Sequence, residues 1–116
     1  MLLLGMESMT MNRGDIYWVD LEPTKGSEIK KKRPCLILSA NPINKARRTV
    51  VVIPLSSSKT VAPPITVTIS CLKKEAIAVI DQIRTVDKSR ILEFIETSND
   101  HDMLKIEHAL RQVLVL

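Results

Sequence analysis

Short β-type runs that follow one another without an intervening helix constrain this chain more than any other feature. Runs rich in aliphatic, β-branched and aromatic residues recur between turn-forming residues, at 16–21, 34–39, 49–53, 65–70, 76–80 and 83–86. Parallel pairing of neighbouring strands needs a crossover connection, usually a helix, and no helical period separates these runs. The sequence therefore predicts an antiparallel sheet.

The C-terminal segment has a different hydrophobic period. Apolar residues recur there at three- and four-residue spacing, namely Met103, Ile106, Leu110, Val113 and Leu114. This spacing is typical of the apolar stripe of an amphipathic helix, for which Ser98 or Asn99 is the expected N-cap. Five or six short strands followed by one helix predict a mainly β fold, in which the helix packs on a small, strongly bent antiparallel barrel.

Length and composition predict one domain. The chain has 116 residues, of which 45% are hydrophobic, and this is enough for a single core. Regular patterning begins only near Arg13, so we expect a loose N-terminal extension at 1–10 and a single domain at 11–116. The first residues lack the basic and apolar regions of a signal peptide, and no apolar run approaches the roughly 20 residues of a membrane span. We therefore expect a cytoplasmic protein.

The basic residues are concentrated in one segment. The formal net charge is +4, yet residues 25–48 alone contain eight Lys and Arg against one acid, Glu28. A segment with a charge of +7 repels itself unless it faces an anion, which favours nucleic acid as the partner. A basic loop that is merely solvated is the alternative.

The side chains with chemical potential lie at the ends of the predicted strands. Arg33 precedes Pro34, where the chain enters a strand, and Ser56 and Ser57 directly follow another. A third polar group, Asp81, Gln82 and Arg84, interrupts the apolar run at 76–86. Each of these alone is more often a turn, a cap or a solvated loop residue. Neither the two cysteines nor the two histidines have metal-ligand spacing, so we expect no metal or other cofactor.

Four blocks of the sequence, taken in order, resemble one known family. They are residues 13–28 (RGDIYWVDLEPTKGSE), 32–39 (KRPCLILS), 52–57 (VIPLSS) and 80–87 (IDQIRTVD). Together with the amphipathic C-terminal segment, they resemble the MazF/PemK (Kid) toxins, the mRNA interferases of type II toxin–antitoxin systems. The resemblance covers residues 12–116, which is nearly the whole chain.

The resemblance implies a small SH3-like antiparallel barrel of the CcdB/PemK type with a C-terminal helix, assembled as a homodimer. It also implies a sequence-specific, metal-independent endoribonuclease that cleaves single-stranded RNA and inhibits growth. A cognate antitoxin with an acidic, partly disordered segment would neutralise it, and any contact with DNA would be made through that antitoxin.

The resemblance also implies particular site residues. Arg33 matches the catalytic arginine of the family's Arg-Pro pair, and Ser56 stands where the family usually has threonine. Asp81 matches the aspartate of the Asp-Gln block that one branch uses in catalysis, and Glu28 matches the glutamate of a loop beside the site. Contacts to RNA are expected from a larger set: Lys25, Lys30, Lys31, Lys32, Ser57, Gln82 and Arg84.

The residue types fit RNA cleavage on chemical grounds. RNA supplies its own nucleophile, the 2′-hydroxyl next to the scissile phosphate. The enzyme must then remove a proton, stabilise a phosphorane and protonate the leaving 5′-oxygen. A guanidinium binds two phosphate oxygens at once, and a hydroxyl can donate another hydrogen bond to the same charge. The general base stays open between Asp81, Glu28 and, less favourably, Arg33.

Two other functions are alternatives. A toxin of the same barrel class could poison a protein target such as gyrase, but CcdB-like inhibitors depend on a tryptophan near the C-terminal end. The only tryptophan here is Trp18, which argues against that function. The other alternative is a nucleic-acid-binding module without catalysis.

Overall fold

A computed structural model describes residues 10–116, so the expected extension at 1–10 lies almost entirely outside the described residues. The elements in chain order are β1 (Asp15–Asp20), β2 (Lys32–Ile37), α2 (Asn41–Ala46), β3 (Thr49–Ser56), β4 (Thr66–Cys71), β5 (Lys74–Val79), η1 (Ile80–Gln82), β6 (Arg84–Asp87), η2 (Lys88–Arg90), β7 (Ile91–Thr97) and α3 (Asp100–Leu114). None of the helices among these residues is long and apolar enough to span a membrane.

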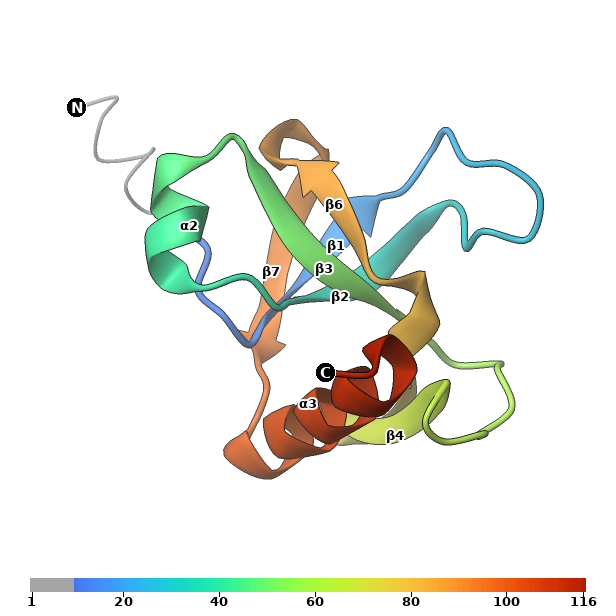
Figure 1. The fold of residues 1–116 in the computed structure, drawn as a ribbon. Helices are drawn as coiled ribbons and strands as arrows, with labels where there is room; N and C mark the ends of the chain where they lie inside the picture. Colours follow the sequence, from blue (N-terminus) through green and yellow to red (C-terminus); the bar gives the residue numbers. More distant parts are fainter. Residues whose placement is uncertain (1–9) are drawn as a thin grey trace.

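The strands form one curled sheet in which every pair is antiparallel, as the sequence predicted (Figure 1). The order is β4-β5-β3-β2-β1-β7, and β6 pairs with β3. β3 is therefore the common strand: its residues 49–52 pair with β6, its residues 52–54 pair with β2, and its last two residues pair with β5. This sharing lets the sheet bend between its two halves, which gives the small barrel-like fold.

The central strands are buried on both faces. Alternate residues enter one core, which includes Cys35, Ile37, Val50 and Val52. Their neighbours, such as Leu36, enter a second core on the opposite face of the sheet. Because both faces are covered, residues 49–53 form a continuous apolar run instead of an alternating one.

The C-terminal helix covers the second core, as expected. Met103, Ile106 and Ala109 of α3 are buried in that core, and the helix lies against β4 and η1. Of the two expected caps, the structure uses Asn99, whose Oδ1 accepts a hydrogen bond of 2.8 Å from the Asp102 amide. The buried Asp102 carboxylate accepts a 2.9 Å bond from the Ser70 amide, which fixes the helix to β4.

Besides the three-residue 3-10 helices η1 and η2, two elements were not predicted from the sequence. The six-residue helix α2 is too short to show a helical period, and it begins just after Ala40, where the Asn-Pro pair had indicated only the end of a strand. β7 pairs with β1 through two register irregularities, and most of its side chains are exposed or half-buried. It therefore has neither the apolar run nor the clean alternation by which strands are recognised.

Candidate active site

Arg33 and Ser56, which lie 23 positions apart in the sequence, line the same surface hollow. The hollow has a volume of about 340 Å³. Its lining residues come from β1, β2, β3, β4 and β5 and from the turn after β3, and they are Trp18, Lys32, Arg33, Pro34, Leu55, Ser56, Ser57, Cys71, Lys74, Glu75 and Ala76. We call this cavity the Arg33–Ser56 hollow. It is large enough to accept a phosphate with part of its nucleotide.

Strand pairing explains why these two residues meet. β2 and β3 are antiparallel with Cys35 opposite Pro54, so the same register continued by two residues places Arg33 opposite Ser56. Arg33 stands near the start of β2 and is half-buried, and its Nε donates a 3.3 Å hydrogen bond to the Lys30 carbonyl. This bond orients the guanidinium, because the accepting oxygen belongs to the backbone.

Ser56 is held in place by the turn that follows it. It is the last residue of β3 and is 6% exposed. Its Oγ accepts a 3.2 Å hydrogen bond from the Ser58 amide, which is a common arrangement for a serine that begins a turn. Oγ also lies 3.5 Å from the Ser58 Oγ, and either hydroxyl can donate in that contact. When Ser58 is the donor, the Ser56 proton is available for donation to an anion.

The basic loop between β1 and β2 is fastened to the rest of the molecule by Gln82. The side-chain oxygen of Gln82 accepts a 3.1 Å bond from the Ile29 amide, and its amide nitrogen donates a 3.4 Å bond to the Ser27 carbonyl. Ile29 is buried, whereas the neighbouring Lys30 and Lys31 are exposed. Gln82 thus holds the backbone of the loop while the lysine side chains reach solvent.

The two carboxylates expected from the resemblance do not line the Arg33–Ser56 hollow. Glu28 is exposed, and its Oε1 accepts a 2.6 Å bond from the Lys25 amide, which closes its own turn. Asp81 is exposed on η1. Arg84, expected to bind RNA, is half-buried in β6 opposite Val52. Of the expected residues, the hollow therefore gathers Lys32, Arg33, Ser56 and Ser57.

The hollow also contains residues that the sequence did not single out. Glu75, near the start of β5, is the only carboxylate among the lining residues, and Lys74 lies next to it. Both belong to a turn-rich piece with no motif of its own, so only the pairing of β3 with β5 brings them to Ser56. Trp18 on β1 is 41% exposed and lines the hollow, so it is not part of the core.

The charge of the hollow suits an anion. Three cationic side chains, Lys32, Arg33 and Lys74, line it together with one acid, Glu75. Burial, with the nearby Glu96 carboxylate as a lesser cause, raises the pKa of the Cys71 thiol, so this lining residue contributes no negative charge near neutral pH. Within residues 10–116, no group of three or more His, Cys, Asp or Glu side chains is placed to hold a metal ion.

These features define a small β protein whose curled sheet carries a cation-lined hollow suited to an anionic ligand. A family model described as a PemK-like, MazF-like toxin of type II toxin–antitoxin systems matches residues 12–114. The chain belongs to this family, which confirms the resemblance found in the sequence.

Similar proteins extend over nearly the whole chain. Endoribonuclease EndoA of Bacillus subtilis (strain 168) is 32% identical over 113 residues, which are 93% of this chain and 97% of that protein. An endoribonuclease in complex with its cognate antitoxin from a mycobacterial species is 25% identical, with a TM-score of 0.77, covering 91% of this chain and 96% of that one. MazF from Deinococcus radiodurans is 23% identical with a TM-score of 0.83, over 92% and 98% of the two chains, and supports the fold.

Proposed function

We propose that this protein is an endoribonuclease toxin that cleaves single-stranded RNA at the Arg33–Ser56 hollow. The observation that carries the proposal is the meeting of a half-buried guanidinium and a buried hydroxyl in one cation-lined hollow. Family membership and the printed activity of its relatives support the same function. A gyrase-type poison has no comparable support from this site.

The reaction needs no protein nucleophile. The 2′-hydroxyl oxygen loses its proton and attacks the adjacent phosphorus, and the bond from phosphorus to the 5′-oxygen then breaks. The products are a 2′,3′-cyclic phosphate and a 5′-hydroxyl, the latter formed when the leaving oxygen takes a proton. We assign to Arg33 the binding of the phosphorane oxygens, whose charge exceeds that of the substrate, and to Ser56 an additional hydrogen bond to the same charge.

Proton transfer requires a further group. Asp81 and Glu28 are candidates from the family resemblance, and Glu75 is a candidate because it lines the Arg33–Ser56 hollow. Geometry favours Glu75, since a general base must come within hydrogen-bond reach of the proton that it removes. The mechanism has no step that calls for a metal ion, so cleavage is expected to persist in EDTA.

The same site also indicates which partners the protein binds. A surface that binds RNA phosphates also suits an acidic peptide segment, so a cognate antitoxin would compete with RNA for it. The complex of a related endoribonuclease with its antitoxin supports this expectation. Homodimer formation is part of the proposal, because β7 is an edge strand that exposes Leu92 and Phe94.

The decisive experiment incubates the purified protein with single-stranded RNA in EDTA and sequences the 5′ ends of the fragments. Arg33→Ala and Ser56→Ala should each lower the cleavage rate about 10²- to 10³-fold, because each removes a fixed donor to the developing charge. Ser56→Thr is the matched control, since it keeps the hydroxyl. RNA that stays intact with the native protein would overturn the proposal.

A further inference from the structure

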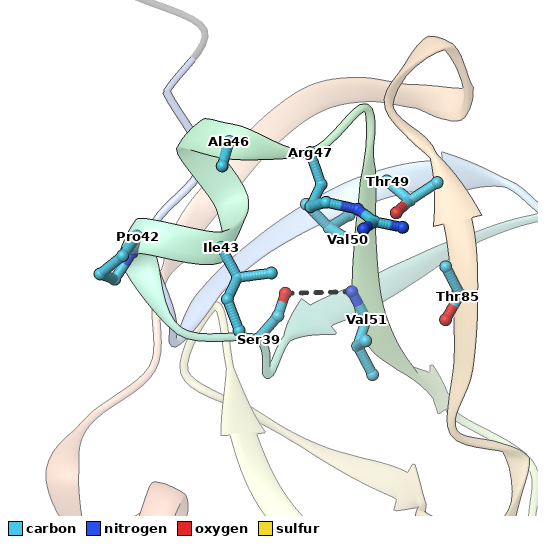
Figure 2. Close-up of a pocket in the computed structure, with 9 residues that line it drawn as sticks. All are labelled: Ser39, Pro42, Ile43, Ala46, Arg47, Thr49, Val50, Val51 and Thr85. Carbon is cyan, nitrogen blue, oxygen red and sulfur yellow. Dashed lines mark hydrogen bonds between the residues drawn. The ribbon is translucent and has the colours of Figure 1, made fainter.

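A second hollow lies at the opposite end of β3 from Ser56. Its volume is about 500 Å³, and it is bounded by Ser39, Pro42, Ile43, Ala46, Arg47, Thr49, Val50, Val51 and Thr85 (Figure 2). We call it the α2 hollow. Its walls are mostly aliphatic, and Ile43 is 52% exposed there. Seven residue steps of β3 separate Thr49 from Ser56, which is about 23 Å at the usual strand rise.

A cation-rich surface adjoins the α2 hollow. Lys45, Ala46, Arg47, Arg48, Asp87, Lys88 and Ser89 line a cavity of about 400 Å³ that shares Ala46 and Arg47 with the α2 hollow. The sheet holds this surface in place, because Thr49 pairs with Asp87 and the Lys88 amide donates a 2.8 Å bond to the Arg48 carbonyl. We call its four cationic residues, Lys45, Arg47, Arg48 and Lys88, the α2–β6 cations.

Among the described residues, none of the α2–β6 cations makes an ion pair, although Arg48 lies close enough to Asp87 to contribute, after the hydrogen bonds from Ser89, to a lowered pKa of that carboxyl. Within the described part of the chain, the single ion pair joins Arg13 to Glu107, far from these residues in the sequence. The nearby Asp87 carboxylate is engaged by the Ser89 amide at 2.8 Å. Lys45, Arg47 and Arg48 are exposed. Four cations lie near a single carboxylate that already accepts a hydrogen bond, so they repel one another. This surface is therefore suited to an external anion.

The groups around Arg47 are also suited to binding a nucleobase. Figure 2 shows the Arg47 side chain reaching from the end of α2 toward Thr49 and Thr85. The hydroxyls of both threonines make no hydrogen bond within residues 10–116, so they are available to the edge of a ligand. Apolar walls and a guanidinium plane can stack an unpaired base, and hydroxyls can read its polar edge.

We propose that the α2 hollow and the α2–β6 cations form a second binding site for single-stranded RNA, with a base in the hollow and phosphates on the cations. The choice of RNA as the ligand rests on the proposed function. An RNA chain that occupies the Arg33–Ser56 hollow could extend along β3 and β6 to reach this site, so it would add affinity for long substrates without taking part in cleavage.

Two other ligands fit the surface less well. An acidic peptide would satisfy the cations, but its aliphatic side chains would leave the Thr49 and Thr85 hydroxyls without partners. A second copy of this chain, related by two-fold symmetry, would bring the same cations toward one another. RNA matches the phosphate-binding and the base-binding parts of the site together.

A binding assay that does not depend on cleavage tests the site. The probe is a fluorescent 40-nucleotide single strand of mixed sequence with 2′-O-methyl riboses, which has no free 2′-hydroxyl to attack. Arg47→Ala/Arg48→Ala should raise its Kd about tenfold and reduce the slope of log K against log salt by about 1.4, which is 0.7 for each lost phosphate contact. Ile43→Gln, which leaves the charge unchanged, should raise Kd two- to threefold.

The control for charge is Lys105→Ala/Arg111→Ala, which removes two cations from α3 and should change Kd less than twofold. An equal loss of affinity in this control, or an unchanged Kd in Arg47→Ala/Arg48→Ala, would overturn the proposal. If the Arg47/Arg48 variant bound the RNA normally but no longer bound poly-L-glutamate, the surface would be a site for an acidic peptide instead.

Cleavage assays separate this inference from the proposed function. Arg47→Ala/Arg48→Ala should raise KM about tenfold for a 40-nucleotide RNA that contains a mapped cleavage site, with kcat unchanged. The shortest oligonucleotide that is still cut should show no difference from the native protein, and an equal effect on both substrates would contradict a separate site. If the native protein cuts no RNA, the proposed function fails, while the binding assay still decides whether the site exists.

Discussion

At the scale of single residues, Glu75 is the side chain whose role the structure changes most. It is the only carboxylate that lines the Arg33–Ser56 hollow, whereas Glu28 caps its own turn and Asp81, on η1, does not line the hollow. We expect Glu75→Gln to lower kcat 10²- to 10⁴-fold, because general acid–base catalysis contributes that much, and to remove one limb of the pH–rate profile.

Glu28→Gln and Asp81→Asn are the matched controls for this prediction. If either of them lowers kcat as strongly while Glu75→Gln leaves it unchanged, the general base is the residue that the family resemblance indicates. Circular dichroism of each variant would check that the fold is retained.

A second prediction at this scale concerns the Cys35 thiol and the pH dependence of stability. Burial raises the pKa of its thiol from 9.0 to about 12, and the nearby Arg84 only partly opposes this effect. Above pH 9 the unfolded chain therefore loses a proton that the folded protein keeps. The free energy of unfolding should fall by about 1.4 kcal/mol per pH unit between pH 9 and pH 12 from this group.

Cys35→Ala should remove that slope, which urea unfolding at several pH values would measure. Cys71 and Tyr17, whose pKa values are also raised by burial, should leave a smaller slope in the variant. Identical slopes in the native protein and in Cys35→Ala would contradict the prediction.

At the scale of elements, the contact between η1 and the basic loop is the one most relevant to function. Gln82 bonds through both ends of its side-chain amide to the backbone of Ser27 and Ile29. Gln82→Ala should speed hydrogen exchange of the Ile29 amide about five- to tenfold, because a typical protein hydrogen bond stabilises by about 1 kcal/mol. RNA binding should weaken in parallel, since the lysines of the loop lose their fixed backbone.

The control for Gln82→Ala is Gln112→Ala, which removes an exposed glutamine from α3. Exchange measured by NMR should be unchanged in that variant. An Ile29 amide that exchanges equally slowly in Gln82→Ala would show that the loop is held by its other contacts, such as the bond from the Leu21 amide to the Lys31 carbonyl.

The elements also show where sequence patterns are informative. The apolar run at 49–53 and the stripe on α3 could be recognised because burial on two faces, or on one helical face, leaves a regular pattern. β7 could not, because its pairing with β1 is irregular and few of its side chains are buried. β7 is instead stabilised by backbone pairing and by contacts such as that between Tyr17 and Phe94, whose ring centroids lie 5.4 Å apart.

At the scale of the whole molecule, we expect two copies of the chain to associate. Leu92 and Phe94 are 39% and 54% exposed on the edge strand β7, and an edge with apolar side chains favours a partner. Sedimentation equilibrium should give about twice the chain mass of 13.0 kDa. Phe94→Glu should shift the equilibrium toward the monomer.

Leu104→Glu is the control, because Leu104 is 63% exposed on α3 and is not part of the β7 edge. A native protein that sediments at the mass of one chain at all concentrations would contradict the prediction. A dimer that Phe94→Glu leaves intact would mean that the chains associate through another face.

The sequence alone determined the fold class and the family, because these depend on local patterns and on ordered motifs. Through the family resemblance it also named Arg33 and Ser56 as site residues, and both line one hollow. Only the tertiary structure decided which carboxylate joins them. Glu75 has no motif and lies 19 positions from Ser56, and it reaches the hollow because β5 pairs with the end of β3. The same holds for the α2–β6 cations, which come from two segments about 40 residues apart that meet where β3 pairs with β6. A sequence pattern records which residues are buried along one element, but strand register determines which exposed residues become neighbours.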